Sequence, residues 1–495
     1  MQKETNTPGC FTGLLQSLRP RAARQNSQTA TVPPAAPATH SHSHKDKELP
    51  PAYDQVADTC CDWSRDVKIS SYPPADGSGI ADWLRLSYNP DVLATIESEL
   101  DKLEPALHSL SMSIHDDPEL AFEETHASAA LASFMSANGF KVTKAYLGLP
   151  TAFRAEFQHG KGGRTLGVNS EMDALPGIGH ACGHNLIAAA GAGIAVAIKA
   201  ALVGHGIPGK VVLLGTPAEE AGCGKGILIE RGAYKDMDAC IMCHPGAGPR
   251  STNVGSSLAL QSFEVEYTGR NAHAGAQPWA GINALDAAVI AYTSISALRQ
   301  QVHPHCRLHG TLFGRNWAAN IIPDYAKMQW RARAPTWAEV QDLRDRMINC
   351  VKAGALATGC DYTITLDDPY LDLRNNKVLG REYLLAANAR YGIPAGFDEG
   401  TSASTDFGNV TYELPALHPG FSIPTPDETS GNHTANFATA AGQPEAHKAM
   451  MLVTKALAHT GFRVLEDDEF YAQVKEEFER EVAPQKALLS QSRSA

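Results

Sequence analysis

The chain has 495 residues, which is more than one hydrophobic core usually serves, so at least two domains are expected. Its 43% hydrophobic and 19% charged residues are typical of a soluble globular protein, and the net charge of −12 disfavours a nucleic-acid-binding function. No apolar run reaches the roughly 18 residues of a membrane span. The nearest one, Leu186–Val203, carries Lys199 and many small residues, which predict a packed helix.

The N-terminal 75 residues are rich in Pro, Ala, Ser, Thr and His and are predicted to be disordered. They lack the pattern of a secretory signal, and the ten cysteines form no obvious disulfide framework. Both features predict reduced thiols in the cytoplasm. Phe11–Arg24 faintly resembles a mitochondrial transit segment, but Glu4 and Pro20 argue against that interpretation.

Two further motifs lie in this tail. His40, His42 and His44 could bind a metal ion, although a solvated tail is the favoured interpretation. Pro50–Tyr53 fits a short polyproline ligand for an aromatic groove of the WW type, although matches of four residues often arise by chance. The ordered part of the chain is predicted to begin near Trp83.

The next region, residues 76–258, alternates strands with helices after two opening helices. The expected helices are Asp91–Leu110, Glu123–Asn138, Leu186–Val203 and Cys223–Gly232, and the expected strands are Ala152–Gln158, Thr165–Asn169, Lys210–Gly215 and Ala239–Cys243. This alternation predicts an α/β catalytic domain with a mainly parallel, helix-covered sheet.

The pattern changes at about Leu258. Residues 259–370 are expected to contain, in order, the strand Ser262–Thr268, the helix Ile282–Val302, the strands Leu308–Phe313 and Lys327–Arg333, the helix Trp337–Ala357 and the strand Tyr362–Leu366. The order β-α-β-β-α-β predicts a ferredoxin-like α+β domain that is inserted into the α/β domain. The α/β domain resumes over 371–465 with a helix at Lys377–Tyr391 and a strand at Ala416–Phe421. Residues 466–495 form an acidic helix, Asp467–Val482, and a polar tail.

Residues with metal-ligand chemistry follow three of the predicted strands. Cys182 and His184 stand in a glycine-rich loop, Glu219 and Glu220 follow the strand that ends at Gly215, and His244 follows the strand that ends at Cys243. Sulfur, imidazole and carboxylate together are typical ligands of a transition metal. Alone, Cys182 would favour a buried structural cysteine, but the carboxyl ends of parallel strands bring these segments to one crevice, which favours the metal site.

The adjacent pair of Glu219 and Glu220 can divide two tasks. Neighbouring side chains point in different directions, so one carboxylate can bind metal while the other acts as a general base. Acids at the start of a helix, favoured by the helix dipole, are the alternative. That alternative explains their position but not the cysteine and histidines nearby.

Seven segments carry a resemblance to a known family. They are Asp173–Ile187, Gly215–Glu220, Gly269–Ala274, Asn320–Pro323, Arg333–Thr336, Ser404–Asn409 and Gly431–Thr434. In order and spacing the region from Leu93 to Phe462 resembles the M20 metallopeptidase family, and within it the aminoacylase- and dipeptidase-like amidohydrolases that use a Cys-Gly-His ligand pair. The resemblance implies a zinc-peptidase-like catalytic domain and an inserted lid that also serves for dimerisation.

The resemblance also implies roles for individual residues of the catalytic domain. The implied metal ligands are Cys182, His184, Glu220, His244 and His433. Glu219 is implied as the general base and acid, and Asp173 as a group that orients a metal-bound side chain. The resemblance implies two divalent ions, for which Zn²⁺ suits thiolate and imidazole while Mn²⁺ and Co²⁺ remain alternatives. His418 is a rival to His433 as the fifth protein ligand.

In the inserted domain the resemblance implies His273 as the residue that stabilises the oxyanion, in family dimers often at the partner's site. Asn320 is implied as an oxyanion or substrate contact, and Arg333 as the group that binds a substrate carboxylate. The alternatives are a strand-end turn for His273 and a salt bridge inside the lid for Arg333. A homodimer through the inserted domain is therefore expected.

One segment departs from the family pattern. Many members have His-x-Asp where this chain has Glu171-Met-Asp173, but the Cys-Gly-His branch supplies its ligands from the later loop, so Glu171 is not counted as a ligand. His180 is not counted either. The expected function is metal-dependent hydrolysis of a small amide, either a dipeptide or an N-acyl amino acid. Condensation of an acid with an amine in a biosynthetic pathway, or a non-catalytic adaptor recruited through the tail, stays an alternative.

Overall fold

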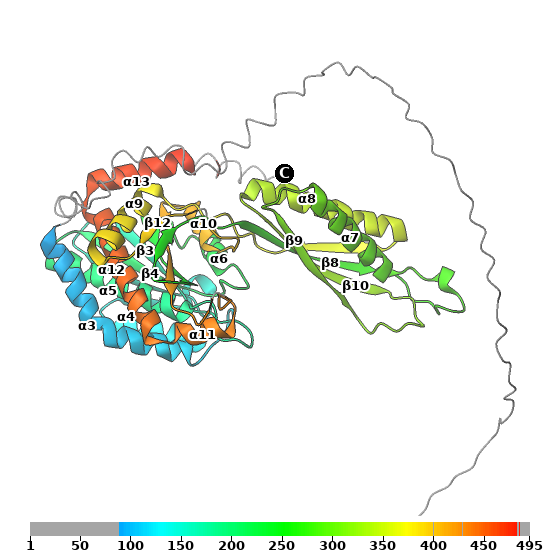
Figure 1. The fold of residues 1–495 in the computed structure, drawn as a ribbon, viewed down its shortest axis with the longest axis horizontal. Helices are drawn as coiled ribbons and strands as arrows, with labels where there is room; N and C mark the ends of the chain where they lie inside the picture. The colour runs from blue at the N-terminus through cyan, green and yellow to red at the C-terminus, as the bar shows by residue number, and fades with distance from the viewer. Residues whose placement is uncertain (1–88, 399, 428, 483–484, 486–495) are drawn as a thin grey trace, which may run out of the picture. The chain divides into compact units, whose positions relative to one another are not determined.

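A computed structural model describes residues 89–398, 400–427, 429–482 and 485 (Figure 1). The predictions for the N-terminal tail lie outside these residues, as does the predicted start of order near Trp83. The domain boundaries and the cytoplasmic location stay predictions.

Two helices open the described chain, α3 (Pro90–His115) and α4 (Thr125–Ala137). Apolar residues at helical spacing, such as Ile96, Leu100 and Leu107, line the buried face of α3. The helix begins where the Asn89 side chain accepts a hydrogen bond from the backbone N–H of Asp91, and a proline occupies its first turn. Both predicted helices are confirmed.

A six-stranded sheet forms the centre of the α/β part. Its strands are β1 (Lys141–Lys144), β2 (Phe153–His159), β3 (Thr165–Glu171), β4 (Gly209–Thr216), β5 (Ala239–Ile241) and β13 (Ala416–Leu417), in the order β1-β2-β4-β3-β5-β13. β4, β3, β5 and β13 pair in parallel, whereas β1 and β2 form an antiparallel edge. The predicted α/β class is confirmed.

Helices cover both faces of this sheet. Along β4, Val211 and Leu213 join one core together with α3, α4, α5 (His184–Gly204) and α12 (Pro444–Glu466). Val212 and Leu214 join a second core with α6 (Gly224–Glu230) and α10 (Phe407–Thr411). A strand buried on both faces reads as a continuous apolar run, as β4 does.

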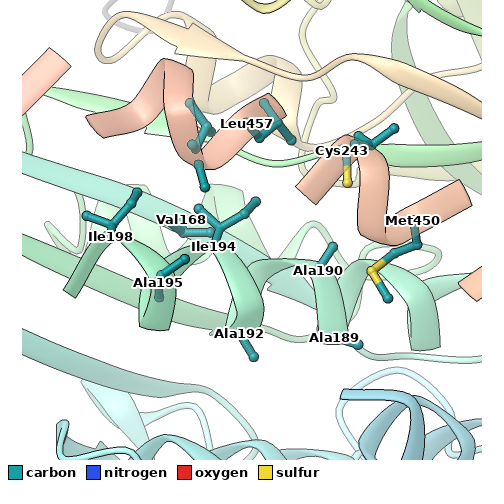
Figure 2. Packing of buried hydrophobic residues seen from close by; sticks show 14 of the residues in the cluster. Val168, Ala189, Ala190, Ala192, Ile194, Ala195, Ile198, Cys243, Met450 and Leu457 are labelled. Atoms are coloured by element: carbon teal, nitrogen blue, oxygen red, sulfur yellow. The ribbon is translucent and has the colours of Figure 1, made fainter. Parts of the chain in front are cut away.

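The apolar helix α5 lies between α3 and α12. Figure 2 shows Ile194 and Ile198 on the side of Leu457 from α12, and Ala192 on the opposite side. α5 is long and apolar enough to cross a membrane, but nearly all of its residues are buried against other parts of the protein. The predicted packed helix is confirmed.

Residues from Ala259 to Leu366 form a second sheet with its own core. The elements follow one another as β8 (Ala259–Thr268), α7 (Ala284–Leu298), β9 (Arg307–Gly314), β10 (Tyr325–Ala334), α8 (Trp337–Thr358) and β11 (Asp361–Leu366). The strand order β11-β8-β10-β9 is antiparallel throughout, and both helices pack on one face (Figure 1). This is the predicted β-α-β-β-α-β arrangement; it is called the lid below.

The predicted strand Ala416–Phe421 is wrong as a single element. It divides into β13 and β14 (Gly420–Ile423), which belong to different sheets, because Pro419 between them has no backbone N–H to continue a ladder. β14 joins a small sheet that the sequence did not predict, with β6 (His244–Ala247), β7 (Thr252–Val254) and β12 (Ala395–Phe397).

The predicted helix Lys377–Tyr391 also changes character along its length. It is α-helical as α9 (Lys377–Leu385) and continues as a π-helical turn over Ala386–Arg390. The last predicted helix is α13 (Asp468–Glu481), and a short helix α11 (Ala435–Ala441) follows the Gly431–Thr434 segment.

Candidate metal centre

The candidate site lies where the parallel strands of the six-stranded sheet end. Asp173 stands two residues after β3, Glu219 three residues after β4, and His244 three residues after β5. The carboxyl ends of parallel strands share one edge of the sheet, which is where ligand sites of α/β proteins gather.

The Cys-Gly-His turn feeds α5 into this edge. Gly183 adopts a φ of +77°, and a Cβ on it would lie 2.5 Å from Cγ of Pro245. Only glycine can adopt this positive φ and also leave the space that Pro245 occupies, without strain. The turn places Cys182 just before α5 and His184 as the first helical residue, both buried.

Asp173 holds two of the predicted ligands at once. Its Oδ1 lies 3.2 Å from Nδ1 of His184, and its Oδ2 accepts a hydrogen bond from the backbone N–H of Glu220 at 2.9 Å. Burial lowers the pKa of His184, but the Asp173 carboxylate outweighs that effect and raises it well above its usual range. With Nδ1 turned to Asp173, His184 presents Nε2 as the atom available to a metal.

Two donor groups share the sulfur of Cys182. One group comprises Cys182, His184 and His244, and the other comprises Cys182, Glu220 and His433; within each group the donor atoms lie within 4.8 Å of one another. Sγ of Cys182 lies 3.4 Å from Nε2 of His244, and Oε1 of Glu220 lies 3.2 Å from Nε2 of His433. Two donors about 2.1 Å from one ion at a tetrahedral angle are about 3.4 Å apart, so these separations suit a shared cation.

Burial and neighbouring charges shift the pKa values of the donor groups. Burial raises the pKa of the Cys182 thiol, and a thiol must lose its proton to become a ligand, which a nearby cation promotes. Burial likewise raises the pKa of Glu220, but the hydrogen bond with His433 and the charge of His184 bring it down to about 2. Nε2 of His184 is buried without a hydrogen-bond partner among the described residues. The residues present therefore fit a metal centre.

The pKa of Glu219 shifts in the opposite direction from that of its neighbour Glu220. Burial, followed by the charges of Glu171 and Glu220, raises the pKa of Glu219 well above its usual range. Its Oε2 lies 3.9 Å from Nε2 of His184, beside the donor atoms. The preceding Ala218 adopts a φ of +58°, an uncommon conformation for a residue with a Cβ, and donates its N–H to Oε1 of Glu124. A carboxyl group with a raised pKa suits proton transfer.

The structure distinguishes His433 from His418 as the candidate for the fifth protein ligand. His433 belongs to a donor group, whereas His418 belongs to none among the residues that the structure describes. The His418 ring instead stacks on His244, with centroids 5.7 Å apart, and packs against Phe407. Burial and the charge of His244 lower the pKa of His418 to about 3. His418 therefore packs against the candidate ligand His244, and His433 is the better candidate for the fifth ligand.

The sequence pattern of the peptidase family M20/M25/M40 matches residues 167–474 of this chain. The Xaa-Arg dipeptidase of Mus musculus is 39% identical over 79% of this chain and 92% of its own length, and that of Homo sapiens is 39% identical over 77% and 90%. The chain belongs to the M20 family. It is accordingly a hydrolase of the metallopeptidase type, as the resemblance predicted.

A solved structure supports the same fold for this M20 hydrolase. A dinuclear metal-binding M20 peptidase from Bacillus subtilis superimposes with a TM-score of 0.54 at 20% identity, over 74% of this chain and 99% of the other. At this identity the likeness concerns the fold.

The lid of the M20 hydrolase carries His273 and Asn320 side by side. Nδ1 of His273 accepts hydrogen bonds from the backbone N–H groups of Gly275 and Ala276, both at 3.1 Å, so the ring proton belongs on Nε2. The backbone oxygen of Asn320 accepts a hydrogen bond from the N–H of Ala274. Both side chains are exposed, and no contact with the donor groups is seen among the described residues. His273 thus shapes a turn, as the alternative held, while it keeps an outward donor.

Arg333 lies near the end of β10 and reaches across to the α/β part. Its guanidinium donates a hydrogen bond to Oγ of Ser404 at 2.9 Å. Among the described residues no carboxylate pairs with it, so the alternative of a salt bridge inside the lid is not observed. Burial and the nearby Arg331 lower its pKa.

Of three buried charges beside the donor groups, sequence reasoning assigned no role to Lys225 and Asp406 and did not count Glu171 as a ligand. Glu171, Lys225 and Asp406 have fully buried side chains, and Nζ of Lys225 bridges the two carboxylates. Lys225 resembled an ordinary surface lysine of a short helix, and Asp406 lay inside a matching segment without a role of its own. The proximity of three segments so distant in sequence had no local signal.

Proposed function

We propose that this M20 hydrolase cleaves the amide bond of dipeptides, with N-acyl amino acids as a second substrate class. The observation that carries the proposal is the pair of donor groups that share Cys182, with Oε2 of Glu219 beside them at 3.9 Å from Nε2 of His184. The two mammalian relatives act on dipeptides with arginine in the second position, so we favour an arginine or similarly basic C-terminal residue.

Two divalent ions, one for each donor group, are part of this proposal. When bound, they would polarise the scissile carbonyl and lower the pKa of the attacking water. Thiolate and imidazole ligands favour Zn²⁺, with Mn²⁺ and Co²⁺ as alternatives.

The residues of the chain then divide the remaining tasks. The ionised carboxylate of Glu219 takes a proton from the attacking water and returns it to the leaving amine, and its raised pKa favours holding the proton between the two steps. His273 offers its Nε2–H, and Asn320 its side-chain amide, to the developing oxyanion. Arg333 binds the substrate carboxylate, exchanging its present partner Ser404 for a charged one.

A homodimer through the lid completes the proposal. β9 is an edge strand of the lid sheet, with unpaired backbone groups along one side. Next to it lies a hollow of about 430 Å³, lined by Val289, Tyr292 and Thr293 of α7 and by Gly310, Thr311 and Leu312 of β9. A second copy could pair with this edge, and a sedimentation measurement that finds only monomers would contradict the dimer.

A substrate panel combined with elemental analysis tests the proposed function. The purified full chain would be assayed on Ala-Arg, Ala-Lys, Ala-Leu and N-acetyl-arginine, with bound metal measured on the same sample. We expect about two equivalents of metal and preferential cleavage of Ala-Arg, both lost on chelation. Two bound ions without hydrolysis of any of the four would overturn the proposed substrate class, and a metal-free protein that resists reconstitution would overturn the metal centre.

A further inference from the structure

One tyrosine hydroxyl holds the turn that begins at Glu219. Oη of Tyr370 donates a hydrogen bond to the backbone oxygen of Glu219 at 2.7 Å. It also accepts one from the backbone N–H of Cys223 at 3.1 Å and a longer one from the N–H of Gly222 at 3.5 Å. The hydroxyl therefore joins the two ends of the turn between Glu219 and Cys223.

The peptide between Glu219 and Glu220 is fixed from both sides. Its oxygen accepts the hydrogen bond from Tyr370, and its N–H donates to Oδ2 of Asp173 at 2.9 Å. The peptide unit is planar and includes the Cα atoms of both glutamates. Two bonds on opposite sides of this plane set its orientation, and with it the directions in which the two side chains leave the backbone.

That orientation matters because the proposed function gives the two neighbours different tasks. Oε2 of Glu219 lies 3.9 Å from Nε2 of His184, whereas Oε1 of Glu220 lies 3.2 Å from Nε2 of His433. Rotation of the shared peptide would move both carboxyl groups away from these places. A group that prevents the rotation therefore contributes to the geometry of the site without touching a donor atom.

Tyr370 is itself held in place. It lies four residues after β11, where the chain returns from the lid to the α/β part. Its backbone N–H and C=O both bond with Leu260, near the start of β8, at 3.0 and 2.8 Å. Asn409 of α10 binds the backbone oxygen of Pro369 at 2.8 Å and the N–H of Leu371 at 2.7 Å. A residue that positions another needs such support of its own.

We propose that Tyr370 positions the carboxylate of Glu219 for proton transfer by fixing the peptide between Glu219 and Glu220. The proposal rests on the proposed function, in which Glu219 moves the proton. Tyr370 acts through Glu219 and is a positioning residue, because its hydroxyl bonds to backbone groups of the turn. Sequence reasoning had placed it at the end of the inserted domain and assigned it no role.

Steady-state kinetics of Tyr370→Phe on Ala-Arg tests the proposal. The variant loses the hydroxyl and keeps the ring. We expect kcat to fall about ten- to hundredfold, because a small displacement of a reacting group is costly, while KM and bound metal stay as in the wild type. An unchanged kcat would overturn the proposal. Loss of metal would also overturn it, since the tyrosine would then support the ligands instead of the base.

Tyr383→Phe is the matched control for the loss of a hydroxyl. Tyr383 is fully buried on α9, and its hydroxyl hydrogen-bonds to Oγ1 of Thr252 in β7 at 2.6 Å. Both variants should lower the urea midpoint, but only Tyr370→Phe should lower kcat. An equal fall of kcat in the two variants would contradict a specific role for Tyr370.

A double-mutant cycle separates positioning from a merely structural role. In the Glu219→Gln background no base remains to be positioned, so Tyr370→Phe should lower the residual kcat by less than about twofold. A fall by the same factor in both backgrounds would overturn the proposal.

Hydrogen exchange tests the contact without any substrate. The amides of Gly222 and Cys223 lose their acceptor in Tyr370→Phe and should exchange about tenfold faster. Unchanged exchange there would overturn the proposal even if the wild-type chain cleaves Ala-Arg. A wild-type chain that cleaves no substrate of the panel, with faster exchange in the variant, would instead remove the proposed function and leave the contact in place.

Discussion

The α/β part and the lid bury different kinds of side chain. In the α/β part, charged and titratable groups such as Glu171, Lys225, Asp406 and His459 are buried. In the lid, no Asp, Glu, Lys, Arg or His between Ala259 and Leu366 is buried, and the core consists of residues such as Phe263, Trp330 and Met347. The lid charges, for example Glu264 with Lys327, pair at the surface.

This difference teaches where the molecule departs from what stability alone requires. An apolar core stabilises a fold at little desolvation cost, whereas a buried ionisable group is unfavourable unless a partner compensates it. None of the Asp, Glu, Lys, Arg and His residues of the lid is buried, so its core is of the first, apolar kind. The α/β part buries ionisable groups around the donor groups. Perturbed pKa values in such a cluster are typical of a functional site.

The largest effect should come from Glu219, since it moves the proton. Glu219→Gln keeps the shape of the side chain but cannot accept the proton, so kcat for dipeptide hydrolysis should fall by about 10²–10⁴. Bound metal should stay as in the wild type. The exposed Glu123→Gln is the control and should leave kcat unchanged. Activity of Glu219→Gln within a factor of two of wild type would contradict its role.

In the lid, the change with the largest expected effect is in the core. Phe263 is 1% exposed, and Phe263→Ala should cost about 3–5 kcal/mol of stability through lost burial and the cavity left behind. Hydrogen exchange measured peptide by peptide should show faster exchange in β8, β10 and α8. Metal content should not change. Loss of metal from this variant would contradict the comparison, because the lid core would then also support the donor groups.

Acid sensitivity belongs to the α/β part, and over any single pH unit its effect on stability should be smaller than that of Phe263→Ala. Burial lowers the pKa of His459 to about 3, whereas an unfolded chain protonates histidine near pH 6.5. Since the folded pKa is the lower one, this contribution to stability is full above pH 6.5. It is lost as the pH falls from about 6.5 towards 3, at about 1.4 kcal/mol per pH unit.

Urea unfolding at a series of pH values would measure this slope, and His459→Gln should reduce it. Changes in the absolute stability of the variant do not matter, because the slope is the measured quantity. An identical slope in His459→Gln and wild type between pH 6.5 and 4 would contradict the assignment.

Much of the candidate site was open to prediction because its candidate ligands stand beside strand ends. A buried apolar strand such as Val211–Leu214 is recognisable in sequence, and Glu219 and Glu220 follow it directly. The same holds for Asp173 after β3 and for Cys182 and His184 at the start of α5. Local pattern and ligand chemistry coincide at these positions, so the sequence placed them in one crevice.

Other residues had no such local signal. His418 and His433 both looked like ligands, and only the packing of His418 on His244 separates them. The small sheet around β14 also escaped prediction, because its strands have three or four residues and Pro419 hides the boundary with β13.

The α/β class, the β-α-β-β-α-β unit and the family could be read from the sequence, because periodic burial and a ligand motif are properties of neighbouring residues. Tertiary structure alone decided that Lys225 joins Glu171 to Asp406 and leaves one oxygen of Glu171 facing His184. That arrangement joins residues up to 235 positions apart, from Glu171 to Asp406. Electrostatic compensation depends on distance in space and on exclusion of water, and the spacing of residues along the chain determines neither.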